Sequence, residues 1–143
     1  MRRPRPSFAS DARGLAGVEF AMVAPVFAIS ILIISDGALY LLRNHDMRAA
    51  VSSAAQYVMQ TGTNANVATA QSIALSAWNT KNGSSAVTVS NACLCGTTAS
   101  ACNTLCSDQS VPESFTTISA TSPYSGVLLG QKTLSASEVV RVR

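Results

Sequence analysis

The sequence predicts an α+β protein in which one long N-terminal helix carries a small antiparallel sheet domain. Apolar residues are concentrated in the first third of the 143-residue chain, and they continue at helical spacing beyond that run. The remainder changes to a period of two, which indicates strands. Hydrophobic residues make up 48% of the chain and charged residues only 12%, about half the usual charged share. This balance is typical of a membrane segment followed by a weakly cored domain.

Residues 1–14 form a basic leader that contains Arg2, Arg3, Arg5 and Arg13. Cytoplasmic flanks of membrane helices are enriched in Lys and Arg, so the leader predicts a cytoplasmic N-terminus and a C-terminal part on the opposite side. Because the arginines lie beside an apolar run, the net charge of +3 has a topological explanation. We therefore expect no nucleic acid partner.

Residues 15–42 predict a transmembrane helix. Its most apolar part, Phe20 to Ser35, contains no charge and ends at Asp36. About 20 residues cross a bilayer, so flanking residues complete the span. The alternative is a cleaved secretory signal peptide. That alternative is less favoured because no small-x-small cleavage site follows before Arg43.

Glu19 and Pro25 are unusual in a plain membrane anchor. A charge near hydrocarbon costs a few kcal/mol unless it is paired or interfacial. The simpler explanation for Glu19 is an interfacial residue at a helix start, where it meets the helix dipole favourably. Pro25 removes a backbone donor and predicts a kink, which membrane helices tolerate.

The segment from Gly14 to Phe20 resembles the prepilin peptidase site of type IV pilins, which is a basic leader ending in Gly before an apolar helix with Glu at its fifth residue. The resemblance implies cleavage between Gly14 and Leu15. Glu19 and Phe20 then become the fifth and sixth residues of the mature chain. In such families the Glu is thought to pair with the new N-terminal amine of a neighbouring subunit and to set its register.

Within that class, Val18 to Ala21 with Pro25 resembles the TadE-like family of the tight adherence (Flp) pilus system. Ser122 to Leu129 and Leu134 to Val142 resemble the closing loop and strand of that family. The middle of the chain, about 63–108, is not covered. The resemblance implies a minor pilin or pseudopilin of a type IVb pilus, acting in pilus assembly, adhesion or secretion.

The partners implied by the same resemblance are other pilin-like subunits, a prepilin peptidase, an assembly ATPase and inner-membrane assembly proteins, together with membrane lipid. The implied location is the bacterial inner membrane, crossed once, with the C-terminal domain periplasmic or extracellular. Two alternatives remain. One is a plain anchored exoplasmic binding module without a pilus, and the other is a soluble secreted disulfide protein.

Residues 43–62 predict an amphipathic continuation of the same helix. Apolar side chains recur at helical spacing, and the pattern ends at Gly62, a normal helix stop. The helix from Leu15 to Thr61 holds about 47 residues and is about 70 Å long. The repeating positions are Tyr40, Met47, Val51, Ala54 and Val58. Ala49, Ala50, Ala54 and Ala55 suit close packing, against either the protein's own core or a neighbouring subunit.

Residues 63–143 predict a small exoplasmic α+β domain. Asn66 is a candidate cap for a second helix that closes near Asn82 and Gly83. That helix places Val67, Ala70, Ala74 and Trp78 on one face, with Trp78 as a core anchor. Three or four short antiparallel strands follow. The segments with strand periodicity are Ala86 to Val89, Phe115 to Ala120 and Thr133 to Val142.

Four cysteines, Cys93, Cys95, Cys102 and Cys106, fall in a polar segment that we expect to be a loop. A zinc site would require thiolate ligands, which usually occur in C-x-x-C pairs. The spacing here is C-x-C and C-x-x-x-C. Because the predicted topology places this segment outside the cytoplasm, we expect two disulfides. The three connectivities remain open, and non-adjacent pairing is favoured.

We expect no enzymatic activity, cofactor or metal. His45, the only histidine, lies beside Asn44 and Asp46 without a nucleophile signature, and we interpret it as a solvated helix residue. Glu19 and Asp36 lie about 25 Å apart on one helix, which is too far for an acid and base pair. No phosphate-binding, dinucleotide-binding or zinc-protease motif is present in the sequence.

Overall fold

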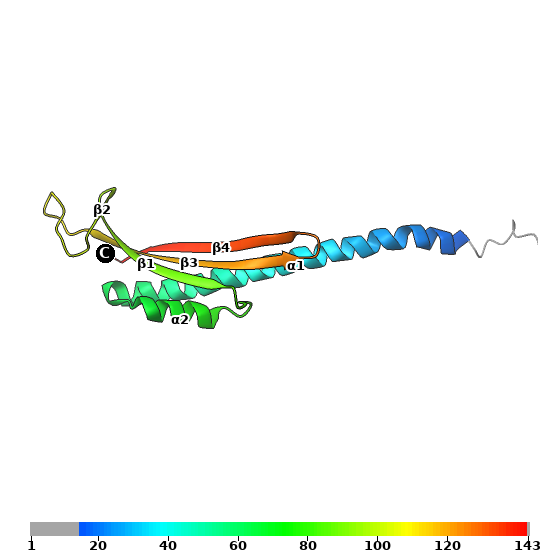
Figure 1. Ribbon diagram of the computed structural model, residues 1–143, viewed down its shortest axis with the longest axis horizontal. Coiled ribbons are helices and arrows are strands. Elements are labelled where there is room, and N and C mark those ends of the chain that lie inside the picture. The colour runs from blue at the N-terminus through cyan, green and yellow to red at the C-terminus, as the bar shows by residue number, and fades with distance from the viewer. Residues whose placement is uncertain (1–14, 143) are drawn as a thin grey trace, which may run out of the picture.

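The computed structural model describes residues 15–142 and consists of one long helix with a small helix and a four-stranded sheet beside its second half (Figure 1). Helix α1 runs from Leu15 to Thr61 over 47 residues and is followed by the short 3₁₀ helix η2, Gly62–Asn64. The predicted end at Gly62 is confirmed. Gly62 has a φ of +61°, a left-handed conformation that glycine adopts without a Cβ clash.

Helix α2, Val67–Ala77, begins at the predicted cap. The Asn66 side-chain oxygen accepts hydrogen bonds from the backbone N–H groups of Ala68 at 2.9 Å and Thr69 at 3.2 Å. The predicted end near Asn82 and Gly83 is wrong, because Trp78 already has an extended backbone. The Trp78 side chain is buried in the core, and the helix ends at Ala77, five residues before Asn82.

The sheet is antiparallel with the strand order β2-β1-β3-β4. Its strands are β1 (Ala86–Cys95), β2 (Thr98–Ser100), β3 (Glu113–Gly126) and β4 (Gly130–Arg141). The three predicted strands are confirmed, but β1 and β3 are longer than expected, and β4 begins at Gly130 and not at Thr133. Cys93 and Cys95 therefore lie on β1 and not in a loop, contrary to the expectation.

Strand β3 also continues through Ser122 and Pro123, which the family resemblance predicts as part of a loop; this prediction is wrong. Proline removes a ladder donor and is confined to edges. Pairing of β3 with β1 ends at Thr121, opposite Ala86. Beyond that point β3 pairs only with β4, where Pro123 faces Thr133, so the proline occupies a position that has become an edge.

The core lies between one face of the sheet and the two helices. Alternate residues of β3, from Thr116 to Tyr124, are buried, as expected for a strand with one face on a core. Helix α1 packs against β3 and β4, and α2 packs against β1. The core contains these side chains: Met47, Ala50, Val51, Ala54, Ala55, Val58, Ala70, Ala74, Trp78, Val87, Ile118, Ala120, Tyr124, Leu134 and Val140.

The amphipathic half of α1 therefore packs into one domain with α2 and the sheet, and we call this domain the head. Met47, Val51, Ala54 and Val58 are buried as predicted, and Trp78 is a core anchor with 1% of its surface exposed. The alanines at 50, 54 and 55 pack inside the protein's own core. Ala49, the fourth of these small residues, is exposed, and its contact with a neighbouring subunit stays a prediction.

A polar contact fixes the segment after α2 onto α1. The Asp46 carboxylate accepts a hydrogen bond of 2.6 Å from the backbone N–H of Thr80. Partial burial raises the pKa of Asp46, but hydrogen bonds from Thr80 and Asn79 outweigh it and the net pKa is lowered. The ionised carboxylate thus holds the chain where it leaves Trp78 and turns toward the sheet.

Candidate functional site

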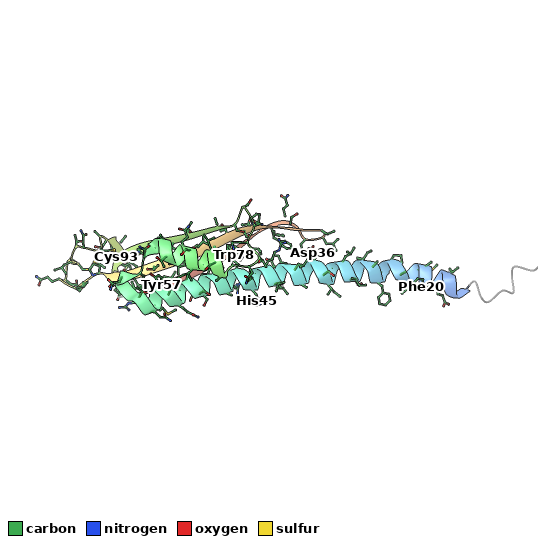
Figure 2. All side chains as sticks on the ribbon, turned by 90° about the horizontal axis from the view of Figure 1, so that it is seen from below. Phe20, Asp36, His45, Tyr57, Trp78 and Cys93 are labelled. Atoms are coloured by element: carbon green, nitrogen blue, oxygen red, sulfur yellow. A yellow bond between two sulfur atoms is a disulfide. The ribbon has the colours of Figure 1, made fainter. Side chains whose placement is uncertain are left out.

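The first half of α1 is apolar and uncovered. This helix is long and apolar enough to cross a membrane, and none of its most apolar 18-residue window is buried within the chain. Figure 2 shows it extending beyond the head, with Phe20 far from the labelled residues of the sheet domain. The exposed large side chains are Val18, Phe20, Met22, Val23, Val26, Phe27, Ile29, Ile31, Leu32, Ile33 and Ile34.

The predicted processing and assembly residues lie at the start of this surface. Gly14 is outside the described residues, and Leu15 is the first residue of α1. Glu19 is exposed and is the only charged residue between Leu15 and Ser35. The helix continues through Pro25, which has no N–H for the carbonyl of Ala21. The kink itself remains a prediction.

A second polar feature lies where α1 leaves this apolar stretch. Asp36 is buried with 6% of its surface exposed, and its carboxylate accepts hydrogen bonds from the end of β3 and from the turn between β3 and β4. Its Oδ1 atom accepts a hydrogen bond of 2.6 Å from the Tyr124 hydroxyl. Its Oδ2 atom accepts bonds of 2.9 Å from the backbone N–H groups of Leu128 and Leu129. We call this contact the Asp36 joint.

Gly126 permits the close approach at the Asp36 joint. A Cβ atom at this position would lie 2.5 Å from Oδ1 and 2.6 Å from Oδ2 of Asp36. It would also lie 2.8 Å from a ring carbon of Tyr124. Such distances are well inside van der Waals contact, so a larger residue would force the turn, the Asp36 carboxylate or the Tyr124 ring to move.

Tyr124 connects the joint to the next turns of α1. Its ring packs edge to face with Tyr40, with centroids 5.4 Å apart. The Arg43 guanidinium lies 5.3 Å from the Tyr124 centroid, within cation–π range. The hydrogen bond to Asp36 raises the pKa of the Tyr124 hydroxyl, and burial acts in the same direction. The hydroxyl thus stays a donor at neutral pH.

An open groove of about 710 Å³ lies beside Tyr124. Arg43 and Lys132 line it together with the polar residues Asn82, Ser125, Gln131 and Thr133. The groove is shallow and carries positive charge from α1 and β4.

Figure 2 shows Cys93, which forms one of the two disulfides, at the opposite end of the head from Asp36. Cys93 pairs with Cys102, and Cys95 pairs with Cys106, with Cα separations of 5.1 and 5.6 Å. This is the favoured non-adjacent arrangement. Each bridge closes a loop of about ten residues and stabilises it by roughly 2–3 kcal/mol in the chain-entropy view. The distal loop is thereby fixed to the end of β1.

Sequence reasoning predicted the exposed apolar helix and the non-adjacent pairing of the cysteines, but it missed the Asp36 joint. In the sequence, Asp36 marks the end of the apolar run and has no evident partner nearby. A signal was present, because a carboxylate beside hydrocarbon needs partners. Its partners lie 88 to 93 positions away along the chain, beyond the reach of local spacing.

His45 is exposed on α1, as predicted. Among residues 15–142, no group of three or more His, Cys, Asp or Glu side chains is arranged to hold a metal ion. Comparison with protein-family models, curated proteins and solved structures found no match to this chain.

Proposed function

We propose that this chain is a pilin-like structural subunit, a minor pilin or pseudopilin of a tight adherence type IVb pilus. The observation that carries the proposal is the division of α1 into two halves. One half is buried in a disulfide-bonded head, and the other is an uncovered apolar rod with a single carboxylate near its start. Such a rod requires a nonaqueous environment, which lipid or neighbouring helices provide.

In this proposal the apolar half of α1 first crosses the inner membrane with its N-terminus in the cytoplasm. The arginines of the leader favour that orientation. A prepilin peptidase then cleaves between Gly14 and Leu15. Trimming removes the basic leader and creates a new amine four residues before Glu19. The head stays on the periplasmic or extracellular side, where its disulfides persist.

Assembly then exchanges lipid contacts of α1 for contacts with helices of neighbouring pilin-like subunits. Lipid tails are as apolar as these side chains, so burial alone gives little driving force for the exchange. Packing and polar pairing must provide it. Glu19 is the one charge available for pairing along the exposed surface, and pairing with a neighbour's N-terminal amine turns a costly buried charge into a compensated one.

The motifs that resemble the TadE-like family support the more specific proposal. Those at the N-terminus, around Glu19 and Pro25, lie on the exposed half of α1. Those at the C-terminus, Ser122 to Leu129 and Leu134 to Val142, lie on the β3–β4 hairpin that contacts α1 through the Asp36 joint. The family's implied partners are other pilin-like subunits, a prepilin peptidase, an assembly ATPase and inner-membrane pilus assembly proteins.

Site-directed photo-cross-linking tests the proposal against a plain membrane anchor. All four cysteines of the chain are in disulfides, so Val26→Cys introduces a single free thiol for a benzophenone maleimide. Val26 is 64% exposed on α1, and Val139, 60% exposed on β4, provides the matched control. In cells with the assembly system, we expect the Val26 label to cross-link to pilin-like subunits and the Val139 label to do so much less.

Cross-linking of the Val26 label to lipid alone, with an active peptidase and assembly system, would contradict the proposal. That result would favour an anchored exoplasmic binding module. Recovery of the chain in the soluble fraction after carbonate extraction would instead favour a secreted disulfide protein.

A further inference from the structure

The turn between β3 and β4 exposes three consecutive apolar side chains. Val127 is 82% exposed, Leu128 is 51% exposed and Leu129 is 42% exposed. The turn is flanked by Gly126 and Gly130, and Gly130 has a φ of +66°. In Figure 1 the hairpin closes at the end of the sheet that faces the uncovered half of α1. The apolar tip therefore points toward the segment proposed to lie in the membrane.

The tip lies at the level where the hydrocarbon of a bilayer would end. Twenty residues from Leu15 reach Ile34, and at 1.5 Å per residue they span about 30 Å, the thickness of the hydrocarbon core. The Asp36 joint, two residues later, holds the turn against the helix at this height. Ile33 and Ile34 are exposed just below it. The apolar surfaces of the helix and the turn thus occupy neighbouring levels.

Two backbone N–H groups at the tip already have hydrogen-bond partners within the protein, as an environment with little water requires. Irregular backbone near hydrocarbon needs partners for its N–H groups. The Asp36 carboxylate accepts bonds from the N–H groups of Leu128 and Leu129, the two leucines of the tip. The same carboxylate is covered by the Tyr124 hydroxyl. The charge is therefore surrounded by donors while the apolar side chains remain uncovered.

Beyond the tip, in the direction of the head, tyrosines are followed by basic side chains, which is the order expected at a membrane surface. Tyr40 and Tyr124 come first, and tyrosines are enriched at the interface. Arg43 lies about 10 Å beyond Asp36 along α1. Lys132 pairs with Tyr124 across the hairpin and lines the same groove as Arg43. Long basic side chains at this height can place their charges among lipid phosphates.

We propose that the β3–β4 turn is a second membrane contact, with Val127, Leu128 and Leu129 seated in the lipid interface on the exoplasmic side. This inference rests on the proposed insertion of α1. The turn adds a contact beside the helix, so the head is held at one height and one rotation on the membrane before assembly. Entry into a filament would require this tip to leave the lipid.

The test uses the full chain reconstituted in vesicles of phosphatidylethanolamine and phosphatidylglycerol. An environment-sensitive fluorophore is attached to Val127→Cys, Phe27→Cys or Val139→Cys in separate samples. A nitroxide on the acyl chain near the headgroup acts as a quencher in matched vesicles. Phe27, 65% exposed on α1, reports membrane insertion of the helix. Val139 reports a head surface away from the turn.

We expect the Val127 label to shift its emission to the blue and to lose most of its intensity in nitroxide vesicles. The Val139 label should show neither change. Quenching at Phe27 without quenching at Val127 would overturn the inference while leaving helix insertion intact. Absence of quenching at both positions would overturn the inference together with the proposed insertion. A Val127 label that is shielded from water but unquenched would indicate contact between protein copies and would also overturn it.

Discussion

Replacing Glu19 with Ala is expected to leave the protein in carbonate-washed membranes but to remove it from filaments sheared from the cell surface. The apolar half of α1 has no other charge between Leu15 and Ser35, so membrane insertion should be retained. In the filament, however, the N-terminal amine of the neighbouring subunit would lose the Glu19 carboxylate with which it pairs. Breaking a buried ion pair by removing one member costs about 3–5 kcal/mol. Because each 1.4 kcal/mol changes an equilibrium constant about tenfold, incorporation should fall about a hundredfold or more.

Two variants control for nonspecific effects of the Glu19 substitution. Glu19→Asp keeps the charge and should restore part of the incorporation. Glu138→Ala removes a carboxylate from β4, on the head, and should incorporate normally. Quantitative immunoblots of the sheared filaments and of the carbonate-washed membranes measure how much of each variant is incorporated. Incorporation of Glu19→Ala at the wild-type level would show that pairing by this carboxylate is not required.

Replacing Trp78 with Ala is expected to destabilise the head more than any other single core change. Trp78 is the largest fully buried side chain among the described residues, and it belongs to the core cluster. Truncation of a buried Trp or Phe to Ala typically costs about 3–5 kcal/mol. Small domains have little more than this in total stability. We therefore expect a largely unfolded head attached to an intact membrane helix.

Urea unfolding of the detergent-solubilised protein, followed by circular dichroism under non-reducing conditions, measures the effect of Trp78→Ala. Val139→Ala is the matched control, because Val139 is exposed on β4 and such changes usually stay within about 0.5 kcal/mol. A decrease of less than about 1 kcal/mol for Trp78→Ala would contradict its place at the centre of the core.

Features that depend on local spacing were predictable from the sequence. The helix period placed Met47 and Val58 on one buried face, and Gly62 marked the end of α1. Asn66 has the side-chain chemistry of a helix cap and forms both expected bonds. Helical spacing from Val67, Ala70 and Ala74 also predicts Trp78 as a core residue, and it is buried. In each case the information lies within a few helical turns.

Strand limits were less predictable because polar residues obscure the alternation. Strand β1 continues to Cys95 through Ser90 and Asn91, which resemble loop residues. The Thr116 hydroxyl donates to the side-chain oxygen of Asn91 at 2.9 Å, which supports polar residues inside the sheet. Pro123 signalled a loop, but its strand has lost one neighbour at that point. Pairing partners, and not the residues alone, decide these limits.

The pairing at the Asp36 joint and between the cysteines depends on the folded chain. Four cysteines allow three connectivities, and the pairing was chosen by where β1 ends relative to the loop after β2. Asp36 and Tyr124 come together because α1 packs under β3 and β4. Their separation of 88 positions contains no local pattern. A costly carboxylate beside hydrocarbon indicated only that some partner was needed.

The N-terminus of the mature protein tests the central claim most directly. The measurement is intact-mass and N-terminal analysis of membrane-extracted protein under non-reducing conditions, with and without a co-expressed prepilin peptidase. We expect an N-terminus at Leu15 only when the active peptidase is present, together with the loss of four hydrogens that two disulfides require. An N-terminus that stays at Met1 or Arg2 despite an active peptidase would contradict the pilin-like account and leave Glu19 without its proposed partner.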